Sequence, residues 1–187
     1  WQYEPKWDGF RCIGFKSGKA VDLRAKSGKP LGRYFPELMA ALSALAATEF
    51  VIDGEIIVEI EDRASFDALQ LRLHPAESRI RKLSEETPAQ LIAFDLLEVS
   101  GNSIMGRPLA ERRRALVTFM AATEPIPVFR LGEATEAEAV ARRWFGREGL
   151  DGIVAKRLDQ RYLPGERAMR KFKLWKTYSI AAMSGKL

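Results

Sequence analysis

The sequence has almost none of the residues that build disulfides and zinc sites, with one cysteine, Cys12, and one histidine, His74, among 187 residues. One cysteine excludes an internal disulfide, and a structural zinc ion takes four cysteine or histidine ligands. No apolar run approaches the roughly 18 residues that span a bilayer, and no secretory signal pattern precedes the first charged motif. These absences favour a soluble protein of a reducing, intracellular compartment, without a membrane partner.

A glycine-rich phosphate loop is also lacking. Neither G-x-x-x-x-G-K-[ST] nor G-x-G-x-x-G occurs, so side-chain cations would have to hold a bound phosphate in place of a helix N-terminus. Lys and Arg number 30 against 25 Asp and Glu, a net charge of +5. This excess of positive charge is compatible with a polyanionic partner and equally with an ordinary solvated surface. The choice between the two depends on where the charged residues lie in the sequence.

Turn residues and hydrophobic periodicity divide the chain into strands and helices without a regular β-α repeat. We expect a hairpin over 10–25 with its turn at Ser17-Gly18. The order of elements predicts an α+β fold, with two mainly antiparallel β-sheets flanked by helices. The other expected helices span 35–47, 65–73, a charged stretch to about 86, 110–121 and 135–149, and the other strands span 50–60, 90–99, 127–131, 151–158 and 170–177, with a loop at 162–169.

Five short islands combine cations, acids and glycines at strand ends or on strands. Several inward-facing lysines are costly unless an anion meets them, and together with Glu55 and Asp151 as oxygen ligands they suggest a polyphosphate with Mg²⁺ or Mn²⁺. In the last island Lys171 and Lys173 share one face of a strand. The islands are KWDGFR (6–11), DGE (53–55), FD (94–95), DGIVAK (151–156) and KFK (171–173).

Such a cluster suits a lysine that attacks phosphorus. The attacking amine must be neutral, whereas the reference pKa of lysine is about 10.4. We expect nearby cations, here Lys156, Lys173 and a metal ion, to lower the pKa of the attacking lysine.

In this order the islands resemble those of the covalent nucleotidyltransferase superfamily, which comprises ATP-dependent DNA ligases, RNA ligases and mRNA capping guanylyltransferases. The chain is most similar to the bacterial ATP-dependent DNA ligases of the C type, with those of the D type related. The flanking text GKPLGRYFPEL, FDALQLR and YLPGERAM matches as well, so the resemblance covers nearly the whole chain. It implies an ATP-grasp-like nucleotidyltransferase core with the nucleotide between the two sheets.

The resemblance also implies roles for matching positions. Lys6 is expected to take AMP from ATP as a phosphoramidate, and Phe94 to stack on the adenine. Asp151 occupies an acidic metal position. The other implied nucleotide contacts are Glu4 near the adenine amino group, Arg11 at the nucleotide or the nick phosphate, Glu55 at the ribose and the metal, and Lys156, Lys171 and Lys173 at the phosphate.

Two positions depart from the family pattern. The fourth island begins with Asp151 where glutamate is usual, which shortens the side chain by one methylene. AKSG at 25–28 stands where the family has Ser/Thr-Arg-x-Gly, so Lys26 replaces an arginine. Lysine keeps the charge and loses the forked geometry, which weakens the expected contact of Lys26 with the 5′-phosphate of a DNA nick.

The resemblance implies a particular domain and set of partners. Related ligases continue into an OB-fold domain that clamps DNA, and we expect residues 1–187 to be the adenylation domain alone, with that C-terminal domain absent from this chain. ATP, Mg²⁺ or Mn²⁺, nicked or broken double-stranded DNA and DNA-repair proteins are the implied cofactors and partners of a monomer in the bacterial cytoplasm.

Three other functions remain open at this point. An RNA ligase or a GTP-using capping enzyme would share the islands, and a catalytically silent nucleic-acid-binding module would share the basic balance. Simpler structural roles compete at single positions: Phe94 as core, Asp53-Gly54 as a bulge, and Lys171 as a solvated edge-strand lysine.

Overall fold

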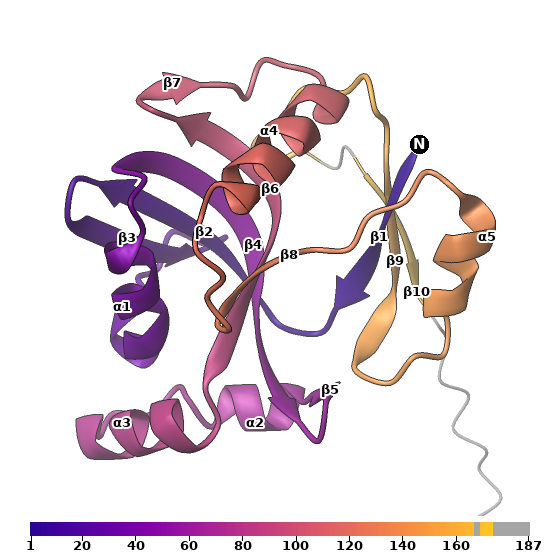
Figure 1. Cartoon of the computed structure of the whole chain (residues 1–187). Coiled ribbons are helices and arrows are strands. Elements are labelled where there is room, and N and C mark those ends of the chain that lie inside the picture. The colour runs from indigo at the N-terminus through magenta and orange to yellow at the C-terminus, as the bar shows by residue number, and fades with distance from the viewer. Residues whose placement is uncertain (167–168, 174–187) are drawn as a thin grey trace, which may run out of the picture.

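The computed structural model describes residues 1–166 and 169–173, which form two β-sheets with helices packed against them (Figure 1). All strand pairs named here are antiparallel except β6 with β8, so the α+β fold with two mainly antiparallel sheets is confirmed. The smaller sheet has the order β1 (Gln2–Trp7), β9 (Leu150–Lys156) and β10 (Arg170–Lys173). The larger sheet runs β3 (Ala20–Ala25), β2 (Phe10–Ser17), β4 (Glu49–Ile60), β6 (Ala89–Val99) and β7 (Asn102–Ser103), with β5 (Arg63–Ala64) beside β4 and β8 (Phe129–Leu131) beside β6.

The two central strands of the larger sheet, β4 and β6, are buried on both faces, which explains their nearly continuous apolar sequences. Each carries one buried acid. Asp53 on β4 is 0% exposed and Asp95 on β6 is 3% exposed, and the two residues are paired across the strands. Because a buried carboxylate needs donors or an opposite charge, these acids mark where polar groups must converge.

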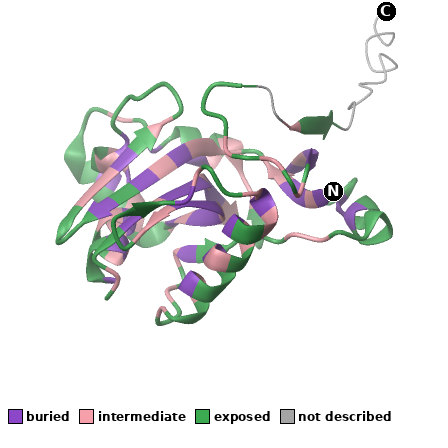
Figure 2. Ribbon diagram, turned by 90° about the horizontal axis from the view of Figure 1, so that it is seen from above, coloured by how far each residue is buried: buried purple, intermediate pink, exposed green. Residues whose placement is uncertain are grey.

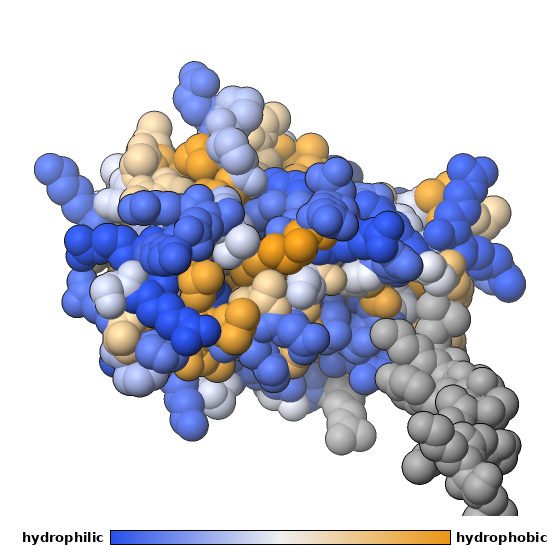
Figure 3. Space-filling view, turned by 90° about the horizontal axis from the view of Figure 1, so that it is seen from below, coloured by the Kyte–Doolittle hydropathy of each residue, from blue (hydrophilic) through white to orange (hydrophobic). Residues whose placement is uncertain are grey.

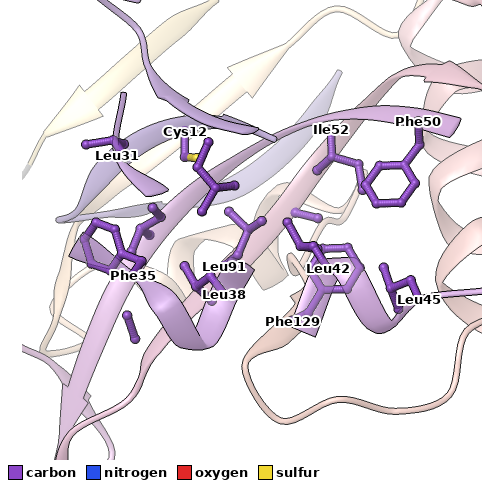
Figure 4. Packing of buried hydrophobic residues seen from close by; sticks show 14 of the residues in the cluster. Cys12, Leu31, Phe35, Leu38, Leu42, Leu45, Phe50, Ile52, Leu91 and Phe129 are labelled. Atoms are coloured by element: carbon purple, nitrogen blue, oxygen red, sulfur yellow. The ribbon is translucent and has the colours of Figure 1, made fainter. Parts of the chain in front are cut away.

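The main core lies between the larger sheet and α1 (Pro36–Ala44). Leu38 and Leu42 are one helical turn apart, so both point at the sheet. They meet Leu91 of β6 and residues of β2 and β4 in one cluster (Figure 4). Cys12 belongs to this cluster and is 0% exposed; burial raises the pKa of its thiol to about 12, as expected for an inert core cysteine.

The helices follow their sequence signals with one exception. Ser65 accepts a hydrogen bond from the N–H of Ala68 and so caps α2 (Phe66–Gln70), as expected. α3 (Glu77–Glu86) is the expected charged helix, and α4 (Leu109–Ala121) packs against β6. Figure 2 shows buried residues running along the strands while exposed residues cover the outer sides of the helices.

The helix expected over 135–149 is wrong. Only α5 (Glu138–Ala141) and a 3-10 turn at Arg142–Trp144 form. Trp144 is buried with Leu150 and Ile153 in a second, small cluster under the smaller sheet. Directly after it, Gly146 and Gly149 adopt positive φ values of 79° and 81°, which end helical geometry.

The strand β1 carries Lys6 and Trp7, the start of the KWDGFR motif, and was not anticipated as a strand; Phe10 and Arg11 lie on β2. The strand β1 exists because it pairs with β9, about 150 residues later in the chain. The expected last strand is confirmed as far as Lys173, and residues 174–177 of that prediction lie outside the described residues, as do 167–168 of the expected loop.

The surface of the described residues is mainly hydrophilic on the face that Figure 3 shows, with apolar side chains exposed in small groups. Leu71 and Leu73, after α2, are about half exposed, at 51% and 48%. No helix within residues 1–166 and 169–173 is long and apolar enough to cross a membrane.

Candidate active site

The centre of the site lies where side chains from all three strands of the smaller sheet meet. Lys6 on β1 and Lys173 on β10 both pair with Gly152 of β9 from opposite sides. The Lys6 Nζ lies 2.6 Å from Oδ2 of Asp151, and the Lys173 Nζ lies 3.4 Å from the same oxygen. The first, fourth and fifth islands of the sequence therefore meet at one carboxylate.

Gly152 permits this arrangement. Its φ is 136°, and a Cβ at this position would lie 1.9 Å from the Phe172 carbonyl oxygen on the neighbouring strand. Only glycine fits between β1 and β10 here. The DGIVAK motif thus needs glycine at this position because β10 passes so close to β9.

The pKa shifts of Asp151 and Lys171 show that several cations lie close together here. Burial by itself would raise the pKa of Asp151, but the hydrogen bond and charge of Lys6, with the charge of Lys173, lower it below its ordinary value. Partial burial lowers the pKa of Lys171, and the charges of Lys6 and Arg11 lower it further. The group in contact with Lys6 is a carboxylate that the sequence pattern had assigned only to metal binding.

Arg11 is held at the start of β2 by a buried acid. Its Nε and Nη2 donate to the two carboxylate oxygens of Asp53, which is 0% exposed. The Tyr162 hydroxyl donates to Oδ2 of the same carboxylate at 2.7 Å. The Arg11 guanidinium then lies 4.5 Å from the centre of the Phe94 ring. Phe94 is half-buried, with its ring toward cations instead of deep in the core.

Glu4 and Lys156 form a second pair at the same aromatic ring. The Lys156 Nζ lies 2.7 Å from a Glu4 oxygen and 4.4 Å from the centre of the Phe94 ring. The Gln2 amide donates to the other Glu4 oxygen at 2.7 Å. Lys156 was expected at the phosphate; the structure brings it to Glu4 and Phe94, the two residues expected to contact the base.

Glu55 is on β4 opposite Arg11. Burial raises the pKa of Glu55 to about 7, although the charges of Arg11 and Lys6 act in the other direction. Gly54 lies at a bulge in the pairing of β4 with β6, and a Cβ there would lie 2.7 Å from the Ile92 carbonyl oxygen. The structure thus has the β-bulge that was expected at Asp53-Gly54. Glu55, the next residue, is close enough for the charges of Lys6 and Arg11 to lower its pKa.

Glu55 and Asp151 are the candidate carboxylate ligands for a divalent metal ion. Within the described residues no group of three or more His, Cys, Asp or Glu side chains could hold a metal ion. Mg²⁺ is commonly held by one or two carboxylates together with substrate phosphates. Glu55 and Asp151 fit such a shared site by residue type, because their carboxylate oxygens are hard donors and the charge of Lys6 acts on both.

Lys26 lies near this cluster although it is on the loop after β3. Together with Arg11 it lines an open pocket of about 410 Å³ whose other walls include Phe10, Leu31 and Leu73. The charge of Lys26 also contributes to the lowered pKa of Lys171. The structure therefore brings Lys26 to the neighbourhood of the other candidate residues.

Two functional neighbours were missed in the sequence. Tyr162 and Arg112 gave no signal beyond their presence in YLPGERAM and in the basic helix. Arg112, 3% exposed, donates to both oxygens of Asp95 at 2.9 Å. Nothing in the periodicity marks an arginine of a charged run as buried, so only the tertiary structure reveals these contacts.

Two mainly antiparallel sheets that bring Lys6, Asp151 and Lys173 together agree with a covalent nucleotidyltransferase core. The chain belongs to the family described as ATP dependent DNA ligase domain, whose model matches residues 1–173. This result confirms the resemblance drawn from the sequence motifs.

Individual relatives agree with this assignment. The chain is 48% identical over 178 residues to DNA ligase C2 of Mycolicibacterium smegmatis, covering 94% of this chain and 50% of that protein. It is 46% identical over 181 residues to DNA ligase C of Mycobacterium tuberculosis, again covering 94% and 50%. The chain thus spans about half the length of the curated relatives it matches.

A solved structure shares the fold. The structure described as mycobacterial DNA ligase D complexed with ATP and MES has a TM-score of 0.69 and 29% identity, covering 94% of this chain and 55% of that chain. The relatives are bacterial DNA ligases, which favours that function over the RNA ligase, capping-enzyme and silent-module alternatives.

Proposed function

We propose that residues 1–187 form the adenylation domain of an ATP-dependent DNA ligase, with Lys6 as the nucleophile. The observation that carries the proposal is the meeting of Lys6, Asp151 and Lys173 at one point between β1, β9 and β10. A lone lysine in a short motif would be weak evidence. A lysine placed beside an acid and a second lysine, within a matching family fold, supports a specific reaction.

The reaction begins with attack of the Lys6 amine on the α-phosphorus of ATP. The Lys6 ammonium first loses a proton to solvent, and the neutral amine then forms an N–P bond as the bond from that phosphorus to the bridging oxygen breaks. Pyrophosphate leaves, and the nitrogen gives its second proton to solvent. Asp151 accepts a hydrogen bond from Lys6 in the free chain, which orients the amine toward the site. Lys171 and Lys173 offset the negative charge of the phosphates as they separate.

The other residues hold the nucleoside. Phe94 stacks on the adenine, and Glu4 accepts a hydrogen bond from its amino group. Support comes from their arrangement, because Glu4 and Phe94 already share the Lys156 side chain. Glu55 accepts from the ribose when ionised, and Arg11 steadies the nucleotide or the nick phosphate.

Glu55 and Asp151 are the residues that would hold Mg²⁺ or Mn²⁺. Such an ion, when bound, neutralises phosphate charge and polarises the P–O bonds. Lys6 and Lys173 both contact Asp151, so the same carboxylate would serve the amine and the ion.

The later steps pass AMP to nicked or broken DNA. The 5′-phosphate of a nick displaces the lysine from phosphorus, and the 3′-hydroxyl then displaces AMP and joins the strands. Lys26, beside Arg11 in the open pocket, is our candidate for the 5′-phosphate contact. We infer that the protein acts as a monomer in the bacterial cytoplasm together with other repair proteins; one relative is named a multifunctional non-homologous end joining DNA repair protein.

The test is the intact mass of the protein before and after ATP with Mg²⁺ or Mn²⁺, and again after pyrophosphate. The expected result is a gain of one AMP that pyrophosphate reverses and that Lys6→Ala abolishes. GTP in place of ATP should give no gain. A Lys6→Ala protein that still gains AMP would remove Lys6 from its role, and labelling by GTP alone would favour the capping-enzyme alternative.

A further inference from the structure

The segment that follows β9, residues 157–162, connects two sides of the proposed nucleotide site, and we name it the β9 strap. It begins after Lys156 and ends at Tyr162, whose hydroxyl reaches Asp53 and so Arg11. Lys156 and Arg11 are the two cations against the Phe94 ring, at 4.4 and 4.5 Å from its centre. One short segment therefore connects both cations that flank the proposed base-stacking residue.

The β9 strap is fixed to the first turn of α4. The N–H groups of Leu109 and Ala110 donate to the carbonyls of Gln160 and Leu158 at 2.9 and 3.0 Å. No side chain caps this helix, whose N-cap residue is a proline, so the strap supplies partners that the first turn needs. Figure 1 shows the chain after β9 passing beside α4.

Arg112 attaches the same segment to the strand of Phe94. Its Nη1 donates to the Gln160 carbonyl at 3.0 Å, while Nε and Nη2 hold both oxygens of Asp95, the residue after Phe94. The strap is thus fastened along its length, and its last residue has little freedom. The Tyr162 N–H, which donates to the Met105 carbonyl at 2.9 Å, completes the attachment.

The hydrogen bonds of the β9 strap therefore hold Tyr162 next to Asp53. Asp53 is fully buried, and its Oδ2 accepts from both Arg11 and Tyr162. Without the Tyr162 hydroxyl, Arg11 would be the one side-chain partner of this carboxylate within the described residues. The phenol adds a donor from another part of the chain and fixes the plane in which the guanidinium must lie.

We propose that Tyr162 is a positioning residue, which holds the Arg11 guanidinium beside Phe94 through the Asp53 carboxylate. The inference rests on the proposed function, because it assigns Tyr162 a part in the reaction of the same site. A purely structural role would satisfy Asp53 without affecting Arg11, and this difference can be measured.

The experiment compares Tyr162→Phe with the wild-type chain and with Tyr34→Phe. Both changes remove one hydroxyl, and within the described residues the Tyr34 hydroxyl makes no hydrogen bond. The first readout is solvent exchange of the Arg11 Nε–H by NMR, assigned through its loss in Arg11→Lys. The second readout is the rate of AMP adduct formation at saturating and at limiting ATP.

In Tyr162→Phe we expect Arg11 Nε–H exchange to become about 10-fold faster, since one partner of a charged hydrogen-bond network is lost. Adduct formation at saturating ATP should fall about 10-fold, with the half-saturating ATP concentration within about 2-fold of wild type. Tyr34→Phe should change neither readout. Combining Tyr162→Phe with Arg11→Lys should add little to the loss from Arg11→Lys, because both act through one group.

Unchanged Arg11 exchange in Tyr162→Phe would overturn the proposal, and so would a wild-type rate of adduct formation despite faster exchange. If the wild-type chain forms no adduct at all, the proposed function fails by itself. Faster Arg11 exchange in Tyr162→Phe would then still support the positioning of Arg11 by Tyr162, so the two failures are distinguishable.

Discussion

The Lys6 ammonium donates a hydrogen bond to the Asp151 carboxylate at 2.6 Å, across two strands that are 145 residues apart in sequence. Lys173 approaches the same carboxylate oxygen. In the free chain one acid is thus shared by the proposed nucleophile and a proposed phosphate ligand. A bound triphosphate would compete with Asp151 for both lysines. The contact between Lys6 and Asp151 would therefore change when ATP binds.

The rate of AMP adduct formation should depend more on the negative charge of Asp151 than on the length of its side chain. We expect Asp151→Asn to slow AMP adduct formation by about 100-fold or more, the scale of losing a charge-assisted contact at a reacting group. Asp151→Glu, the residue usual in the family, should stay within about 10-fold of wild type. Single-turnover mass spectrometry measures both, and an Asp151→Asn protein as fast as wild type would separate this acid from the reaction.

Glu55 should give the site a pH dependence. Its pKa is raised from 4.5 to about 7 in the folded chain, so the folded state holds this proton more tightly than the unfolded chain. The resulting stability is complete below about pH 4.5 and is lost as the pH rises through about 7. The ionised form, which accepts from the ribose or binds metal, predominates only above about pH 7.

The second-order rate of adduct formation should therefore rise about 10-fold from about pH 6 to about pH 8. In Glu55→Gln that rise should disappear along with most of the rate, and the unfolding temperature should fall less between about pH 5 and about pH 7. Glu85→Gln, a change of an exposed helix residue, is the control. An unchanged pH profile of unfolding in Glu55→Gln would contradict the assignment.

Gly152→Ala should damage the site without touching a charged residue. The new Cβ would collide with the Phe172 carbonyl at a φ of 136°, so β10 must move away with Lys171 and Lys173. We expect a loss of about 2 kcal/mol or more in the free energy of unfolding and a larger loss of adduct rate. Gly106→Ala has open space around its Cβ and should match wild type in both denaturation and labelling.

The buried Arg72 should stabilise the connection between α1, α2 and α3. Its side chain is 0% exposed and donates to Glu37 and to the carbonyls of Tyr34 and Thr87. Removing one partner of a buried ion pair typically costs about 3–5 kcal/mol. Urea denaturation of Arg72→Met should show a loss near the lower end of that range, because Glu37 retains the N–H of Ala89.

The exposed Arg79 on α3 offers a matched control for that measurement. Arg79→Met should change the free energy of unfolding by less than about 0.5 kcal/mol. Equal losses in the two variants would show that the burial of Arg72 contributes nothing specific.

The sequence by itself determined the local structure and the chemistry available. The N-cap at Ser65 and the apolar strands appear in the structure, and so does the hairpin, whose turn lies at Gly18-Lys19, one residue later than expected. Each of these depends on residues a few positions apart. The motifs identified Lys6, Asp151 and Phe94 as candidates, since their residue types and order are those of one family. The helix over 135–149 is shortened to Glu138–Ala141, and Trp144 packs with Leu150 and Ile153, a contact that the helical pattern does not contain.

Only the tertiary structure decided how these residues are paired. It made residues 2–7 a strand by pairing them with β9, and it paired Lys156 with Glu4 across those two strands. It also brought Tyr162 to Asp53 over 109 positions in the chain. Such pairings depend on strand register and on the close packing of two sheets, and neither is encoded in the periodicity of any single segment.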